Sequence, residues 1–94
     1  MLYVILCTDK PGHEQVRLDN RAAHLDYLRR HGDQLFAAGP TLSEDGARMT
    51  GSLLVLDFPD RAAVDAFTAN DPYAKAGLFS EVVVRPWKKV VPAN

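Results

Sequence analysis

The chain has 94 residues, 47% of them hydrophobic and 24% charged, which is enough for one domain with a thin core, expected to span residues 1–94. Its net charge of −1, from 11 basic and 12 acidic residues, argues against nucleic acid or an anionic membrane as a partner. The single cysteine, Cys7, cannot form an internal disulfide, and the first residues lack a signal-peptide pattern, so a cytoplasmic location is expected.

The first part of the chain predicts a strand, a helix and a second strand. Residues 2–7 are continuously apolar and rich in β-forming side chains, which is typical of a buried strand. Turn residues separate this strand from a helix expected over residues 14–30. A second strand is expected over residues 34–38, closed by Gly39-Pro40. The apolar face of the helix is expected to consist of Leu18, Ala22, Leu25 and Leu28.

The second part predicts a strand, a helix and a final strand. Residues 51–58 form the third expected strand, and Asp60 caps the helix that follows it. The last strand is expected over residues 81–91, with Pro86 indicating a bend or an edge position. The order strand, helix, strand, strand, helix, strand predicts an α+β, ferredoxin-like antiparallel sheet with both helices on one face.

The predicted strands do not alternate between apolar and polar residues, as strands with one solvated face should. Residues 3–6, 53–56 and 82–84 are all apolar. Because two helices can cover only one face, the other face would expose a large apolar patch. We therefore expect two sheets to pack face to face in a homodimer, forming a dimeric α/β barrel that could assemble further.

His24 is the first candidate for chemistry. At 100° per residue it lies on the flank of the expected apolar face of the first helix, where a side chain can point into a cleft. Imidazole titrates near neutral pH and can both accept and return a proton. A half-buried histidine bonded to a carbonyl is the competing explanation. Arg21 lies one turn earlier and could pair with a carboxylate of a substrate.

Asp71 and Tyr73 form a second candidate group. Asp71 could orient an imidazole or act as the base itself, although Asp before Pro is also an ordinary helix cap. Tyr73 could donate a hydrogen bond to a substrate oxygen or simply cover the mouth of the barrel. Ser52 and the backbone of Gly39-Pro40 could contact a ligand. No metal, phosphate or dinucleotide motif is present, so neither a metal site nor a cofactor is expected.

Taken together, five short motifs resemble the YciI-like (YCII-related) family, and the resemblance extends over essentially the whole chain. They are Arg21-Ala22-Ala23-His24-Leu25, Ala38-Gly39-Pro40, Gly51-Ser52, Asp71-Pro72-Tyr73 with Ala76-Gly77, and Arg85-Pro86-Trp87-Lys88-Lys89.

The resemblance implies a dimeric, ferredoxin-like α/β barrel with a catalytic centre built on a histidine and an aspartate, here His24 and Asp71. The wider superfamily includes muconolactone isomerases, dehydrochlorinase-like enzymes and monooxygenases that act on small cyclic compounds. The leading hypothesis is therefore a cofactor-free lyase or isomerase that moves a proton on a small oxygenated or ring-containing substrate. The alternatives are a non-catalytic small-molecule-binding or accessory subunit, and an oxygenase that uses haem or a metal.

Overall fold

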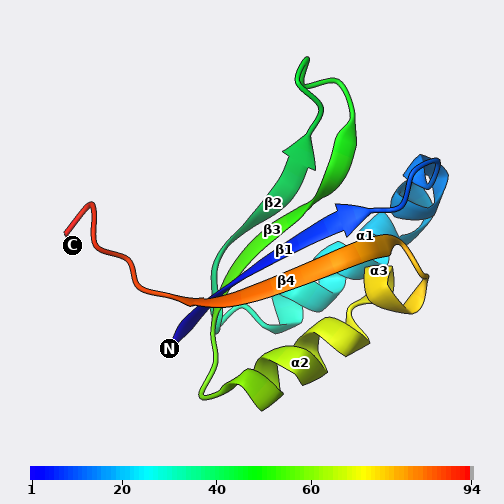
Figure 1. Ribbon diagram of the computed structural model, residues 1–94. Coiled ribbons are helices and arrows are strands. Elements are labelled where there is room, and N and C mark those ends of the chain that lie inside the picture. Colours follow the sequence, from blue (N-terminus) through cyan, green and yellow to red (C-terminus); the bar gives the residue numbers. More distant parts are fainter. Residues whose placement is uncertain (94) are drawn as a thin grey trace.

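A computed structural model describes residues 1–93 as a four-stranded sheet with its helices on one side (Figure 1). The order of elements is that of a ferredoxin-like fold, with an additional short helix before the last strand. The elements are β1 (Leu2–Asp9), α1 (Glu14–Arg30), β2 (Leu35–Leu42), β3 (Met49–Asp57), α2 (Arg61–Asn70), α3 (Pro72–Lys75) and β4 (Phe79–Trp87).

The strands lie in the order β2-β3-β1-β4, and each neighbouring pair is antiparallel. Val4 in β1 stands opposite Val55 in β3 and Arg85 in β4. Each outer strand contains one proline, Pro40 in β2 and Pro86 in β4. An edge strand tolerates proline because one side of its backbone has no ladder partner, so the expected edge position of Pro86 is confirmed.

Several strand boundaries differ from those expected by one or two residues, and the ends of β2 and β4 differ by four. β2 continues to Leu42, so Gly39-Pro40 lies inside the strand instead of closing it, with Pro40 opposite Ser52 in β3. β4 covers Phe79–Trp87 and ends before the apolar pair Val90-Val91. The apolar pattern past Trp87 does not form a strand because these residues have no neighbouring strand with which to pair.

The core lies between the sheet and the helices. Ile5, Leu56 and Val64 are fully buried, and Phe67 on α2 packs against the same group. Tyr27 of α1 donates a hydrogen bond to the carbonyl of Phe67 (2.7 Å), which joins the two long helices. None of the helices in residues 1–93 is long and apolar enough to cross a membrane.

The inner face of α1 agrees only in part with the one that hydrophobic periodicity predicts, because Leu28 is buried but Leu18 and Ala22 are not. Arg17, His24 and Leu28 are buried, whereas Leu18 is 55% exposed and Ala22 is exposed. Helices normally bury their apolar stripe, but buried polar side chains are tolerated when each has a partner. His24 therefore lies at the centre of the buried side of α1 and not on its flank.

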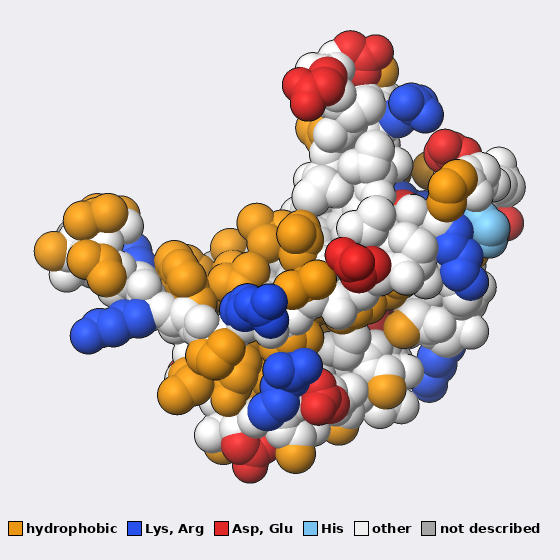
Figure 2. Space-filling model, in the orientation of Figure 1, with side chains coloured by type: hydrophobic (Ala, Val, Ile, Leu, Met, Phe, Trp, Pro, Cys, Tyr) orange, Lys and Arg blue, Asp and Glu red, His pale blue; other side chains and the backbone are white. Residues whose placement is uncertain are grey.

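The sheet face opposite the helices is apolar and uncovered, as the strand pattern predicts. Leu6 and Leu53, on the two central strands, are 42% and 43% exposed, and Phe36 and Trp87 lie over the same face with ring centroids 6.2 Å apart. Figure 2 shows hydrophobic side chains gathered toward the end of the sheet from which the C-terminal tail extends. No element within residues 1–93 covers this face.

Gly51 marks a close approach between β3 and β1. A Cβ atom at this position would lie 2.1 Å from the carbonyl oxygen of Cys7 and 2.8 Å from the hydroxyl of Thr41. Because both strands are held in the sheet, only glycine fits here. Ser52 follows directly, so this close packing fixes where its side chain leaves the strand.

Candidate functional site

His24 and Asp71 are in contact although 47 residues separate them in the chain. The Nδ1 atom of His24 lies 2.9 Å from Oδ1 of Asp71, and both side chains are almost completely buried. The histidine comes from the inner face of α1, and the aspartate from the junction between α2 and α3. The fold thus brings together the two residues that the family resemblance implies as a centre.

Asp71 also caps a helix, so both of its expected contacts occur at once. Its Oδ1 accepts a hydrogen bond from the backbone N–H of Tyr73 (2.9 Å), and Pro72 occupies the first turn of α3. A side-chain oxygen that binds the first free N–H groups is the usual N-terminal cap. The cap holds the carboxylate in a fixed position relative to the imidazole of His24.

The contact assigns the tautomer of His24. An ionised carboxylate only accepts hydrogen bonds, so Nδ1 carries the hydrogen and donates it to Asp71. Nε2 then keeps its lone pair and can accept a proton from a bound molecule. Asp71 does not line the adjacent cavity, so the geometry favours His24, and not Asp71, as the group that faces a ligand.

A cavity of about 220 Å³ lies between α1 and the strands β2 and β3, and His24 forms part of its wall. All five residues expected to contact a substrate also line it: Arg21, Gly39, Pro40, Ser52 and Tyr73. Apolar side chains complete the wall, among them Leu25 and Leu54. A few polar groups in an apolar hollow are typical of a small-molecule site.

Tyr73 is packed inside the protein and does not cover an open mouth. It is 1% exposed, and its ring stacks on that of His24 with centroids 4.0 Å apart and planes 17° from parallel. Burial raises the pKa of Tyr73, although the positive charges of Arg17 and Arg21 act in the opposite direction. The phenol therefore stays protonated near neutral pH and restricts the orientation of the imidazole.

Arg17 and Asp9 belong to the same site, and sequence analysis missed both. The guanidinium of Arg17 binds Asp9 through Nε–Oδ2 (2.7 Å) and Nη2–Oδ1 (2.9 Å), and it lies 4.5 Å from the ring centroid of Tyr73. Burial alone would lower the pKa of Arg17, but the bonds to Asp9 outweigh it and raise the pKa. Spacing offered a signal, because Arg17 precedes His24 by two helical turns on one face.

The sequence matches the model of the YCII-related domain over residues 1–88. The chain belongs to the YCII-related family.

The sequences of curated relatives align with almost the whole of this YCII-related protein. Protein YciI of Escherichia coli O6:H1 is 39% identical over 97 residues, covering 96% of this chain and 99% of that protein. An uncharacterized protein of Haemophilus influenzae is 36% identical with the same coverage. Among solved structures, 5-chloro-2-hydroxyhydroquinone dehydrochlorinase (TftG) of Burkholderia phenoliruptrix, in complex with 2,5-dihydroxybenzoquinone, is 43% identical with a TM-score of 0.87, covering 94% of each chain.

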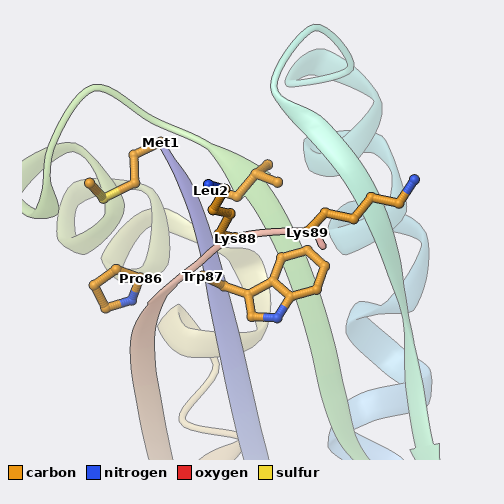
Figure 3. A pocket seen from close by; sticks show the side chains of 6 residues that line it. All are labelled: Met1, Leu2, Pro86, Trp87, Lys88 and Lys89. Atoms are coloured by element: carbon orange, nitrogen blue, oxygen red, sulfur yellow. The ribbon is translucent and has the colours of Figure 1, made fainter. Parts of the chain in front are cut away.

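The YCII-related protein has a larger hollow, of about 650 Å³, at the other end of the sheet, where β1 begins and β4 ends (Figure 3). Its lining residues are Met1, Leu2, Pro86, Trp87, Lys88 and Lys89. It contains neither a histidine nor a carboxylate, and none of the residues expected to bind or transform a substrate lines it. The smaller cavity beside His24 is therefore the candidate site. Among residues 1–93, no group of His, Cys, Asp or Glu side chains is arranged to hold a metal ion.

The buried thiol of Cys7 predicts that the YCII-related protein loses stability at alkaline pH. Burial, with a smaller effect from Asp71, raises the pKa of its thiol from 9.0 to about 12. The thiol stays neutral in the folded protein but ionises above 9.0 in the unfolded chain, so stability falls between about pH 9 and pH 12. The loss should be on the order of 3 kcal/mol near pH 12.

Urea unfolding of the native protein and the Cys7→Ala variant from pH 8 to pH 11 measures this effect. Cys7→Ala should be less stable at pH 8, because it leaves a small cavity, but should lose stability less steeply with rising pH. Tyr27 and Tyr73, whose pKa values burial also raises, are present in both proteins and cancel in the comparison. Equal slopes would show that Cys7 does not contribute.

Proposed function

We propose that this protein is a cofactor-free enzyme of the lyase or isomerase kind, which moves a proton on a small oxygenated ring compound. His24 is the general base and acid, and Asp71 holds its tautomer and stabilises the imidazolium that forms. The single observation that carries the proposal is the contact of these two side chains at the wall of the 220 Å³ cavity. A buried carboxylate behind a histidine is the arrangement that proton-transfer sites need.

The other lining groups support a role in holding an oxygenated ring. Ser52, Arg21 and Tyr73 offer hydrogen-bond donors, while Gly39 and Pro40 supply a flat apolar wall. At about 220 Å³ the cavity admits one small ring and not an extended substrate. The proposal requires Nε2 of His24, at the cavity wall, to face a hydroxyl of such a ring.

The similarity to TftG supports the same class of reaction. A dehydrochlorinase removes the elements of HCl, so a base accepts one proton and the carbon–chlorine bond breaks with its electron pair leaving on chloride. This elimination needs no external oxidant or reductant, and one histidine that accepts the proton satisfies it. The TM-score of 0.87 to that enzyme makes an elimination the first reaction to test.

The test is chloride release from 5-chloro-2-hydroxyhydroquinone by the purified protein, monitored with a chloride electrode and by absorbance of the quinone. Turnover above the rate without protein supports the proposal. Binding of the compound without chloride release would favour the non-catalytic binding subunit instead. Neither binding nor turnover, with this compound or with its dechlorinated and carboxylated analogues, would contradict the proposal.

We also propose that the uncovered sheet face joins two copies of the chain. Leu6 and Leu53 sit at the centre of this face and Trp87 at its end, beside the larger hollow in Figure 3. A contiguous apolar face across the centre of a sheet is rarely left exposed to water on a soluble monomer. A second copy supplies a matching apolar face of the same shape, since a two-fold interface is self-complementary.

A lysine at the centre of this face should break the dimer. The native protein should scatter light as a particle of twice the chain mass of 10.4 kDa, whereas Leu6→Lys should give the single mass at micromolar concentration. Each leucine is worth about 1.5–3 kcal/mol of burial and enters a two-fold interface twice. Leu18→Lys, at an exposed leucine of α1, is the matched control. A native monomer, or a dimeric Leu6→Lys, would contradict this interface.

A further inference from the structure

Asp9, Arg17 and Ser52 form a buried chain of hydrogen bonds next to the cavity. Nη2 of Arg17 lies 2.9 Å from Oγ of Ser52, and the same guanidinium binds both oxygens of Asp9. Ser52 is 2% exposed and Arg17 3% exposed, and both line the cavity. We infer that the Asp9–Arg17 pair holds Ser52 as a hydrogen-bond donor to a negatively charged oxygen of the ligand, so that the cavity selects oxyanions.

The direction of the hydrogen bonds carries this inference. Guanidinium has only donors, so Oγ of Ser52 must accept from Arg17. The hydroxyl proton of Ser52 then needs an acceptor of its own, and no residue from 1 to 93 provides one. Because the side chain is buried at the cavity wall, the remaining place for an acceptor is inside the cavity.

Arg17 cannot turn to change this arrangement. Its Nε and Nη2 atoms bind the two oxygens of Asp9, and the second hydrogen of Nη2 goes to Ser52. A bidentate pair of this kind fixes the plane of the guanidinium. Arg17 is thus a positioning residue for Ser52, and its own charge is compensated by Asp9.

The charge of the cavity wall fits the same class of ligand. No carboxylate lines the cavity, whereas Arg21 is exposed at its wall and forms no ion pair within the described part of the chain. An anionic oxygen would therefore meet the hydroxyl of Ser52 and the positive field of Arg21 together. A ring of the same shape without an oxygen at this point would leave the buried hydroxyl without an acceptor, which is unfavourable, and an anionic oxygen accepts a stronger hydrogen bond than a neutral one.

This inference rests on the proposed function, because it names the ligand class of the same cavity. The probe is 2,5-dihydroxybenzoquinone, a coloured acid whose visible absorption differs between its neutral and ionised forms. Binding is measured by calorimetric titration, and the ionisation of the bound quinone by absorbance against pH. The native protein should bind the ionised form and keep the bound quinone ionised at lower pH than the free compound.

Ser52→Ala should weaken binding about 10- to 100-fold, the effect of losing one hydrogen bond to a charged group. The bound quinone should also ionise closer to the pH at which the free compound does. Asp9→Asn removes the charge that holds Arg17 in place. It should change the affinity for the quinone and the ionisation of the bound quinone in the same direction as Ser52→Ala, but less. Ser80→Ala is the matched control, because Ser80 is exposed and donates to the carbonyl of Thr8 outside the cavity.

The outcomes separate this inference from the proposed function. If the native protein binds the quinone and Ser52→Ala binds it equally well, the role of Ser52 is wrong while the proposed function stands. If the pH at which the bound quinone ionises is shifted as much in Ser52→Ala as in the native protein, the role of Ser52 is also wrong. If the native protein does not bind the quinone at millimolar concentration and also releases no chloride, both the ligand class and the proposed function are contradicted.

Discussion

Replacing His24 by glutamine should lower kcat for chloride release by 10²- to 10⁴-fold while the protein stays folded. General acid–base catalysis by one positioned side chain contributes this much, equivalent to about 3–5 kcal/mol of barrier. Glutamine keeps an amide that can bond Asp71 but cannot accept a proton at the position of Nε2. Because binding uses other lining groups, KM should change much less than kcat.

His31 provides the matched control for this substitution. It caps the C-terminal end of the same helix, two turns later, and its Nδ1 contacts the carbonyl of Tyr27 instead of a carboxylate. It does not line the cavity, so His31→Gln should change kcat less than about threefold. Circular dichroism and urea unfolding establish that both variants are folded. Equal activity of His24→Gln and the native protein would remove His24 from the mechanism.

Asp71→Asn tests how the carboxylate acts. Asparagine keeps an oxygen for the cap on Tyr73, but it can also donate a hydrogen bond and so permits the other tautomer of His24. Nitrogen-15 NMR of the imidazole should show the hydrogen on Nδ1 in the native protein and a mixture in the variant. A drop in kcat without this change of tautomer would mean that Asp71 acts through structure alone.

Breaking the buried pair of Arg17 and Asp9 should have the largest effect on stability. Arg17→Leu leaves the carboxylate of Asp9, only 9% exposed, without its partner. Uncompensated buried charges of this kind cost about 3–5 kcal/mol. Small domains have only about 5–15 kcal/mol of stability, so this single change removes a large part of it.

Arg61→Leu is the control, because Arg61 and Asp65 make a similar contact through Nε (2.9 Å) at a site where both side chains are more than half exposed. Exposed pairs of this kind contribute less than about 1 kcal/mol. Urea unfolding at pH 7 measures both variants. The double variant Arg17→Leu/Asp9→Leu should recover much of the loss, since no unpaired charge remains. A cost below 1 kcal/mol for Arg17→Leu would show that water reaches Asp9.

Hydrophobic patterning and turn residues together predict the order of the elements and the bounds of the helix over residues 14–30, and the patterning also predicts the apolar outer face of the sheet. It does so because the burial of apolar side chains leaves a regular trace in each segment. His24 and Asp71 are candidates from their own positions in the sequence, and the family motifs imply them as one centre. The fold brings them into contact, and their catalytic roles stay predictions. The residues named one by one as possible ligand contacts line the same cavity as His24.

Two features depend on tertiary contacts that no local pattern contains. The inner face of α1 is polar because Asp9 and Asp71, distant in the chain, supply partners for Arg17 and His24. Periodicity selected Leu18 and Ala22 instead, since it assumes that a buried face is apolar. β2 runs through Gly39-Pro40 because it lies at the sheet edge, where a missing N–H goes unused. Neither the partner of a buried charge nor the edge position of a strand is fixed until segments that are distant in the sequence pack together.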